Sequence, residues 1–229
     1  MTVSPSYIPR LYGRRQDKPL KPRQAALMET LLPPVSVPVP AEGQIDLAAL
    51  FPDQNTYWLE VGFGGGEHLA WQAGQNPNVG LIGAEPFING VAKLLVHVDD
   101  GALDNVRIHH GDARPLMERL PAGCLSRMFV LHPDPWPKAR HHKRRVINRW
   151  FFADAARLLR PGGQLRIASD IPDYITWTLM HARHVPTLRW TARKMADWTM
   201  RADDWPQTRY EAKALRAGRI ATYLTFERI

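Results

Sequence analysis

The chain has 229 residues, of which 45% are hydrophobic, so it can bury one substantial core but is short for two full-sized domains. No stretch reaches the roughly 20 apolar residues that span a bilayer, and the start MTVSPSYIPRLYGRR lacks the apolar segment of a secretory signal. We therefore expect a cytoplasmic protein that does not enter a membrane. The single cysteine, Cys124, excludes an internal disulfide.

The formal net charge of +8 is concentrated in two basic segments. Residues 1–26 hold six basic residues against one acid, and residues 138–149 hold six with no acid, so the rest of the chain is slightly acidic. Basic residues gathered in this way are typical of proteins that bind a polyanion, although two solvated surface faces would give the same pattern. The basic residues are Arg10, Arg14, Arg15, Lys18, Lys21 and Arg23 in the first segment, and Lys138, Arg140, Lys143, Arg144, Arg145 and Arg149 in the second.

In chain order, the first 50 residues are predicted to form a basic, proline-rich arm and linker, followed by one domain over residues 51–229. The prolines of PLKP and LLPPVSVPVP hinder a long helix or a central strand, so we expect the arm to be mobile. Short apolar runs from residue 56 onward predict buried strands, with helical stretches between them. The clearest helix is expected within residues 146–163, ended by Pro161 and Gly162. The predicted strands are TYWLEV, VGLIGA, VRIHH, SRMFVL and GQLRIAS.

This alternation of strands and helices predicts an α/β fold with a doubly wound, mostly parallel sheet, in which ligands bind beyond the carboxyl ends of the strands. The first strand leads into a loop with Gly62, Gly64 and Gly66 and then into a helix, the layout of a nucleotide-binding turn. A dinucleotide fingerprint would need glycine at position 67, where this chain has Glu67, and Glu60 precedes the loop. Two carboxylates would repel a pyrophosphate, whereas S-adenosylmethionine presents an ammonium, a sulfonium and hydroxyl groups. The loop therefore favours S-adenosylmethionine over a nicotinamide cofactor.

Two further strands are also followed by acidic residues. Glu85 ends the run VGLIGAEP and could accept hydrogen bonds from both ribose hydroxyls, while Asp112 ends VRIHHGDA and could accept one from the adenine amino group. Together with Glu60, these three acidic strand ends favour a cofactor site over chance or structural capping. The two histidine pairs of the chain lack metal-ligand spacing, so no metal is expected.

The segment LHPDPWPKARHHKRR is the most distinctive stretch of the chain. His132, Asp134 and Trp136 each precede a proline, which keeps their backbone away from helical geometry, so we expect a stiff, extended loop. In an extended loop, side chains two residues apart share a face, so these three would point the same way. One carboxylate and one aromatic ring suit a flat base held for methyl transfer, although a rigid surface turn would also explain the prolines.

Together, the segments EVGFGGGEH, GAEP, GDA, HPDPWPKARHHKRR, ASD and TRYE closely resemble the bacterial tRNA (guanine-N7)-methyltransferases, from about residue 56 to the C-terminus. The resemblance implies a class I S-adenosylmethionine-dependent methyltransferase fold. It also implies methylation of guanine 46 in the variable loop of tRNA to 7-methylguanosine. We expect no obligatory protein partner.

The same resemblance implies roles for individual residues. Asp134 would be catalytic and would also contact the cofactor. The other residues predicted to bind S-adenosylmethionine are Glu60, Gly62, Gly64, Gly66, Glu85, Asp112 and Ala113. The residues predicted to contact the substrate are Lys138, Asp170, Thr208, Arg209, Tyr210 and Glu211.

Two alternatives remain open at this point. The D-P-W-P run is loosely similar to the D-P-P-[YWF] loop of adenine amino-group methyltransferases, although the second proline is displaced here. A non-catalytic RNA-binding module would also explain the basic segments, but it would have no affinity for S-adenosylmethionine.

Overall fold

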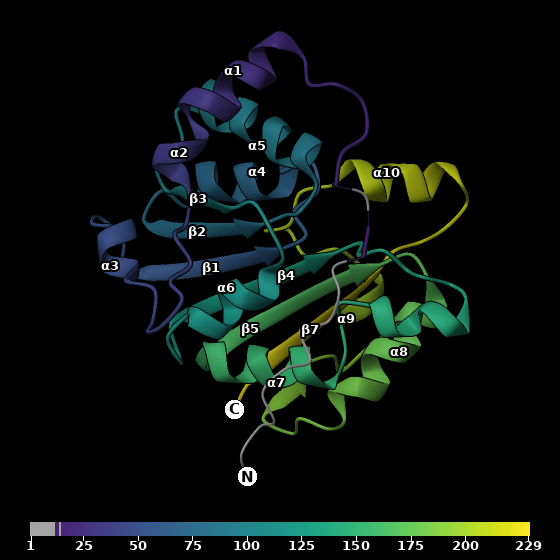
Figure 1. Cartoon of the computed structure of the whole chain (residues 1–229). Helices are drawn as coiled ribbons and strands as arrows, with labels where there is room; N and C mark the ends of the chain where they lie inside the picture. The colour runs from purple at the N-terminus through teal and green to yellow at the C-terminus, as the bar shows by residue number, and fades with distance from the viewer. Residues whose placement is uncertain (1–11, 14) are drawn as a thin grey trace.

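A computed structural model describes residues 12, 13 and 15–229 of the chain. Within these residues, seven strands form one sheet in the order β3-β2-β1-β4-β5-β7-β6 (Figure 1). Strands β1 to β5 run parallel, while β7 is antiparallel to β5 and β6 is antiparallel to β7. The strands are β1 (Thr56–Val61), β2 (Val79–Ala84), β3 (Val106–His109), β4 (Leu125–Leu131), β5 (Leu159–Ser169), β6 (Leu188–Trp190) and β7 (Thr222–Arg228). The predicted mostly parallel sheet is confirmed.

Helices cover both faces of this sheet, as a doubly wound fold requires (Figure 1). One face carries α1 (Pro22–Thr30), α2 (Leu32–Val35), α4 (Glu67–Gln75) and α5 (Ile88–Gly101). The other face carries α6 (Ala113–Arg119), α7 (Arg149–Leu158) and α8 (Pro172–Ala182). The remaining elements are α3 (Leu47–Leu50), the 3₁₀ helix η1 (Ala139–Arg144), α9 (Ala196–Thr199) and α10 (Arg209–Arg216).

The helix predicted within residues 146–163 is confirmed as α7, with narrower bounds. Asn148 caps its start, because the side-chain oxygen accepts hydrogen bonds from the backbone N–H groups of Trp150 and Phe151. The helix ends at Leu158, and β5 begins at the next residue and includes Gly162, whose φ of 76° favours glycine.

Part of the predicted linker is built into the core. Helix α1 packs on α5, and Arg23 pairs with Asp99 across this contact at 2.6 Å. Hydrophobic residues farther along the segment, among them Val37, Ile45 and Leu47, are buried in the same cluster as strand residues. The boundary between arm and domain at residue 50 remains a prediction.

The strand order places a topological switch point between β1 and β4, because the chain continues from them toward opposite edges of the sheet. Ligands of such sheets bind where the loops after these two strands diverge. Those loops are the glycine loop and the HPDPWPK segment.

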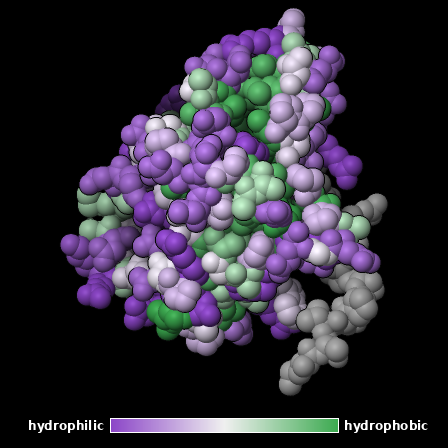
Figure 2. All heavy atoms as spheres, turned by 90° about the vertical axis from the view of Figure 1, so that its left-hand side faces the viewer, coloured by the Kyte–Doolittle hydropathy of each residue, from purple (hydrophilic) through white to green (hydrophobic). Residues whose placement is uncertain are grey.

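The face seen in Figure 2, which is the left-hand side of Figure 1, shows mostly hydrophilic residues with smaller hydrophobic groups between them. Across the described residues, no helix combines the length and apolar character that crossing a membrane requires.

Candidate active site

The glycine loop after β1 depends on backbone conformations that favour glycine. Gly62, Gly64 and Gly66 have φ values of 73°, 58° and 78°. The loop also lies close to α5, where a Cβ added to Gly90 would be only 2.1 Å from the carbonyl oxygen of Gly64. A glycine at position 90 of α5 therefore allows the loop to approach this helix.

Glu85, which directly follows β2, is hydrogen-bonded to the glycine loop. Its buried carboxylate accepts backbone hydrogen bonds from Gly64 at 2.8 Å and from Phe87 at 2.9 Å. Burial raises the pKa of Glu85, and this effect outweighs the two backbone hydrogen bonds, which lower it. A carboxylate offers about four acceptor positions, so acceptors remain for the ribose hydroxyls expected at this residue.

Glu60 has a buried partner that sequence reasoning missed. His68 Nδ1 lies 2.7 Å from the Glu60 carboxylate, and both side chains are 2% exposed. Gln72 Nε2 lies 3.2 Å from His68 Nε2 and donates to the carbonyl of Asp204. Because an amide nitrogen only donates, His68 Nε2 must accept, so Nδ1–H donates to Glu60. The eight-residue separation between Glu60 and His68 matches no sequence pattern, so only the fold reveals this pair.

Asp112, the third acidic strand end, caps α6. Its carboxylate accepts from the backbone N–H of Arg114 at 3.0 Å and also pairs with the Arg114 guanidinium. Ala113, the other residue predicted here, begins α6 and is buried. Part of the acceptor capacity of Asp112 is thus already used within the protein.

These residues suit S-adenosylmethionine by their chemistry. Carboxylates at the ends of β1, β2 and β3 offer acceptors for an ammonium and for hydroxyl groups, and the glycine loop leaves room for close approach. A cavity beside the loop is lined by Glu60 and His68 and also by His132 and Tyr210. It therefore joins the glycine loop to the HPDPWPK segment and the C-terminal part of the chain.

The HPDPWPK segment does not have the expected extended geometry. His132 and Trp136 have φ values of 48° and 42°, in the left-handed region. A following proline disfavours right-handed helical geometry but does not dictate a strand, and tertiary contacts here select the left-handed alternative. His132 faces Asp170 at 3.5 Å, whereas the Trp136 ring lies 4.8 Å from the Arg144 guanidinium. The prediction that His132, Asp134 and Trp136 share a face is therefore wrong.

Asp134 lies between these two residues. Desolvation by its surroundings raises the pKa of its carboxyl, although the residue as a whole is exposed. Among the described residues, Asp134 takes part in no side-chain hydrogen bond or ion pair of the kind that engages Glu60, Glu85 and Asp112. Its position in the loop after β4 places it at the switch point.

Comparison with known proteins decides the family. The model of a family described as putative methyltransferases matches residues 54–224. A tRNA (guanine-N(7)-)-methyltransferase of Rhodospirillum rubrum is 49% identical over 232 residues, covering 100% of this chain and 91% of that relative. Another from Ruegeria pomeroyi is 50% identical over 95% of this chain and 94% of its own length. The chain belongs to the tRNA (guanine-N(7)-)-methyltransferase family.

Solved structures agree with the class I methyltransferase fold expected for this family. An antibiotic-related methyltransferase has a TM-score of 0.57 at 16% identity, covering 80% of this chain and 92% of its own. The 16S rRNA methyltransferase KamB has a TM-score of 0.57 at 15% identity, covering 82% of this chain and 95% of its own. At such low identity, the likeness shows the fold alone.

Within the TRYE segment of the family, two of the residues predicted to contact substrate face inward. The Thr208 hydroxyl caps α10 by accepting from the backbone N–H of Glu211 at 3.2 Å. The buried Glu211 carboxylate accepts from the Tyr223 hydroxyl at 2.7 Å and lies 3.4 Å from Arg201. These contacts hold α10 against the sheet.

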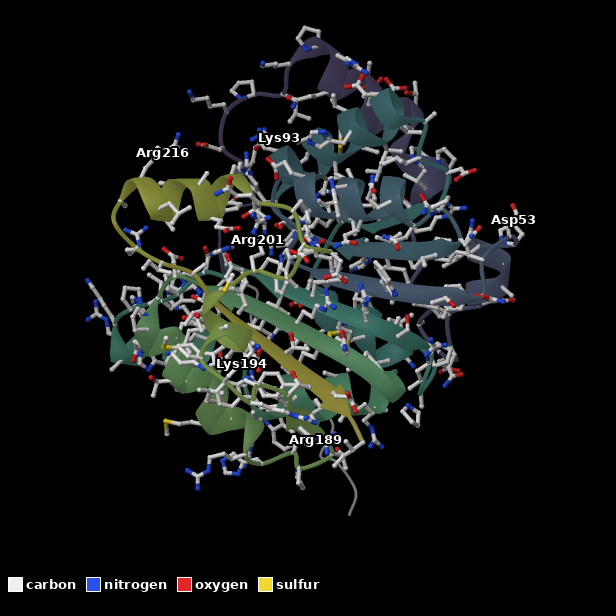
Figure 3. All side chains as sticks on the ribbon, turned by 180° about the vertical axis from the view of Figure 1, so that it is seen from behind. Asp53, Lys93, Arg189, Lys194, Arg201 and Arg216 are labelled. Atoms are coloured by element: carbon white, nitrogen blue, oxygen red, sulfur yellow. The ribbon has the colours of Figure 1, made fainter. Side chains whose placement is uncertain are left out.

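The other two residues of TRYE are exposed and lie over the glycine loop. Arg209 lies 3.2 Å from Glu67, and the Tyr210 ring lies next to Gly64. Arg209 and Tyr210 are more than 140 positions from the glycine loop in the sequence, and the fold brings them beside it at the carboxyl ends of the strands. Seen from behind, Arg216 marks the far end of α10, with Arg201 closer to the centre, while Asp53 lies at the opposite end of the molecule (Figure 3).

Asp170 and Lys138, also predicted to contact substrate, have different surroundings. Asp170 follows β5 and accepts from Arg219 Nε at 2.7 Å while facing His132. Burial alone would raise the pKa of Asp170, but the hydrogen bonds from Arg219 and His132 together lower it. Lys138 is exposed just before η1.

The described part of the arm lies between the HPDPWPK segment and α5. Tyr12 meets Trp136 edge to face at 6.4 Å between ring centroids, and the Arg144 guanidinium lies 4.7 Å from the Tyr12 ring. Farther along, the carbonyl of Arg15 accepts from the backbone N–H of Ile88. The arm thus contacts loops on both sides of the candidate site.

The residues of the two basic segments differ in their exposure and in their partners. Arg15, Lys18 and Lys138 are exposed, as expected for phosphate contacts, whereas Arg23 pairs with the acids of α5 and Arg145 is buried. Two basic residues of the first segment, Arg10 and Arg14, lie outside the described residues.

Proposed function

We propose that this protein transfers a methyl group from S-adenosylmethionine to N7 of guanine in tRNA, forming 7-methylguanosine, and that its target is guanine 46 of the variable loop. The observation that carries this proposal is 49% identity over the whole chain to a relative named for guanine-N7 methylation of tRNA. The position of Asp134 in the loop after β4, at the switch point, supports it. The same similarity favours guanine N7 over the adenine and non-catalytic alternatives.

S-adenosylmethionine supplies an electrophilic methyl group. For its binding, we assign Glu60 to the amino-acid end, Glu85 to the ribose hydroxyls and Asp112 with Ala113 to the adenine. His68 keeps the Glu60 carboxylate in place by donating to one of its oxygens, which leaves the other free to accept. The backbone of Gly62, Gly64 and Gly66 allows close approach at the loop.

Guanine N7 carries an in-plane lone pair and no proton, so the transfer needs no general base. Orientation of the base and stabilisation of developing positive charge should dominate. Asp134 is suited to both tasks, because its carboxylate can accept from the N1–H and amino edge of guanine, an edge that adenine does not present.

The tRNA backbone would be held by exposed basic residues, among them Arg15, Lys18 and Lys138. Phosphate contacts of this kind set the register of the RNA without reading its sequence. Arg209 and Tyr210 lie beside the glycine loop and would contact the target nucleoside near the cofactor, with Thr208, Glu211 and Asp170 supporting them. The reaction needs no further protein and would take place in the cytoplasm.

The test is methylation of an unmodified tRNA transcript with S-adenosylmethionine carrying a labelled methyl group, followed by nucleoside analysis. We expect label in 7-methylguanosine, and none when guanine 46 of the transcript is replaced by adenine. Label in a methyladenosine, or a wild-type protein that binds tRNA without transferring label, would overturn the proposal.

A further inference from the structure

The loop that carries Asp134 is held in an unfavourable backbone conformation. His132 and Trp136, on either side of Asp134, both have left-handed φ values and both precede a proline. This region is strained for a residue other than glycine, and such a conformation persists only where surrounding contacts fix it. The position of the Asp134 carboxylate therefore depends on what anchors this loop at its two ends.

The amino-terminal end of the loop is anchored to β5. The backbone N–H of His132 donates to the carbonyl of Ala168 at 2.8 Å, and the imidazole faces Asp170. Both contacts are made by His132, before Asp134. They leave the part of the loop after Asp134 to be held by something else.

The other anchor is Arg145, which directly follows η1 and whose side chain is 0% exposed. Its Nε donates to the carbonyl oxygen of Pro135, the residue next to Asp134, at 2.9 Å. Its Nη2 pairs with Asp173 at the start of α8, and this hydrogen bond lowers the pKa of the Asp173 carboxyl. One planar guanidinium thus connects the loop that carries Asp134 to α8.

Two aromatic rings fix the plane of this guanidinium. Its central carbon lies 5.1 Å from the centroid of the Tyr174 ring and 5.0 Å from that of Trp177, both on α8. Arginine suits such a position because it donates in several fixed directions while stacking on aromatic faces, whereas a lysine ammonium is a single flexible point. A contact between Arg145 and an RNA phosphate is excluded by its burial, although Lys143 and Arg149 of the same basic segment are exposed.

We propose that Arg145 is a positioning residue for methyl transfer: by holding the Pro135 carbonyl against α8, it fixes the direction of the Asp134 carboxylate. The inference rests on the proposed role of Asp134. Arg145 touches neither the base nor the cofactor, so its effect is on the rate of the chemical step rather than on tRNA affinity.

The decisive variant is Arg145→Lys, which keeps the charge but cannot donate to Pro135 and Asp173 from one stacked plane. We expect the single-turnover rate at saturating tRNA and S-adenosylmethionine to fall at least tenfold. The dissociation constant for tRNA should stay within twofold, and its dependence on salt should be unchanged, because no exposed charge is lost.

Arg157→Lys is the matched control. Arg157 lies on α7 and donates to the backbone carbonyls of Leu120 at 2.9 Å and Met117 at 2.6 Å, away from the loop. The Arg157→Lys variant therefore loses the same kind of contact, hydrogen bonds from a guanidinium to backbone carbonyl oxygens, without changing the position of Asp134. We expect Arg157→Lys to lower the melting temperature but to keep the wild-type single-turnover rate.

Amide hydrogen exchange supplies a readout that does not require activity. In Arg145→Lys, and not in Arg157→Lys, the peptide spanning residues 130–144 should exchange faster than in the wild type. Unchanged exchange together with an unchanged rate would overturn the inference, as would equal rate losses in the two variants. A weaker salt dependence of tRNA binding would show that Arg145 contacts phosphate, which also overturns it. If wild-type protein forms no 7-methylguanosine, the proposed function fails, and the exchange result still decides whether Arg145 holds the loop.

Discussion

Replacing Glu85 tests the link between the fold and the cofactor site. Its carboxylate accepts from the backbone N–H groups of Gly64 and Phe87, so Glu85→Ala leaves both donors without this partner. An unpaired buried group costs about 1–3 kcal/mol, which gives roughly 2–6 kcal/mol of lost stability. For a chain of this size, the lower end alone corresponds to about 4–8 °C in melting temperature. Glu85→Gln keeps one acceptor oxygen and should lose about half as much.

The same change should weaken cofactor binding. Loss of a charged hydrogen-bond acceptor costs about 1.5–3 kcal/mol, or roughly ten- to a hundredfold in the dissociation constant for S-adenosylmethionine. Titration calorimetry measures this affinity, and urea unfolding measures the stability. Asp53→Ala is the control, because Asp53 is an exposed acid at the opposite end of the molecule (Figure 3).

The raised pKa of Glu85 adds a pH dependence with a definite sign. Because the folded state raises this pKa, ionisation of Glu85 disfavours folding, and the wild type loses stability relative to Glu85→Gln as pH rises through the folded pKa. The stability gap between the two should therefore be larger near pH 4 than at pH 7. An unchanged melting temperature in Glu85→Ala would refute the structural role. Lost stability with unchanged cofactor affinity would remove Glu85 from the cofactor site.

Four further predictions concern the arm, Asp134 and the contacts that hold α10. Deleting residues 1–20, which leaves α1 intact, should weaken tRNA binding and flatten its salt dependence, and an unaltered slope would mean that the arm does not touch RNA. Asp134→Ala should lower the single-turnover rate far more than tRNA affinity, with Asp134→Asn retaining activity only if orientation of the base dominates over charge. The wild-type rate should be level from about pH 6.5 to 8.5. It should fall toward acid at a higher pH than for an ordinary aspartate, because the pKa of Asp134 is raised. A tenfold rise in rate per pH unit across the level range would indicate a deprotonated nucleophile instead. Tyr223→Phe removes the hydroxyl that donates to buried Glu211, so it should cost about 1–3 kcal/mol of stability, and an unfolding midpoint equal to that of the wild type would contradict the pairing.

Local patterns of the sequence were enough to predict the centre of the sheet. The runs TYWLEV and VGLIGA coincide with β1 and β2, because strands buried on both faces of a parallel sheet are continuously apolar. The glycine loop after β1 and the presence of α7 were also predicted, although α7 ends at Leu158, before Pro161 and Gly162. The HPDPWPK and TRYE motifs were sufficient to predict the family.

The edge of the sheet could not be predicted in the same way. The run TYLTFER forms β7, which enters the sheet antiparallel between β5 and β6. Nothing near this run indicates that β5 is its partner. The short helices before residue 51 were missed for a related reason, because their packing on α5 and the core stabilises them despite the surrounding prolines.

The sequence by itself therefore determined the strands of the parallel core, the glycine loop, the acidic strand ends and the resemblance to a methyltransferase family. Only the tertiary structure decided what each polar side chain does. Glu60 is held by His68, Thr208 and Glu211 face inward, and Arg145 leaves the basic run to hold the carbonyl next to Asp134. Charge and periodicity are properties of the chain, but burial and hydrogen-bond partners depend on residues that are close only after folding.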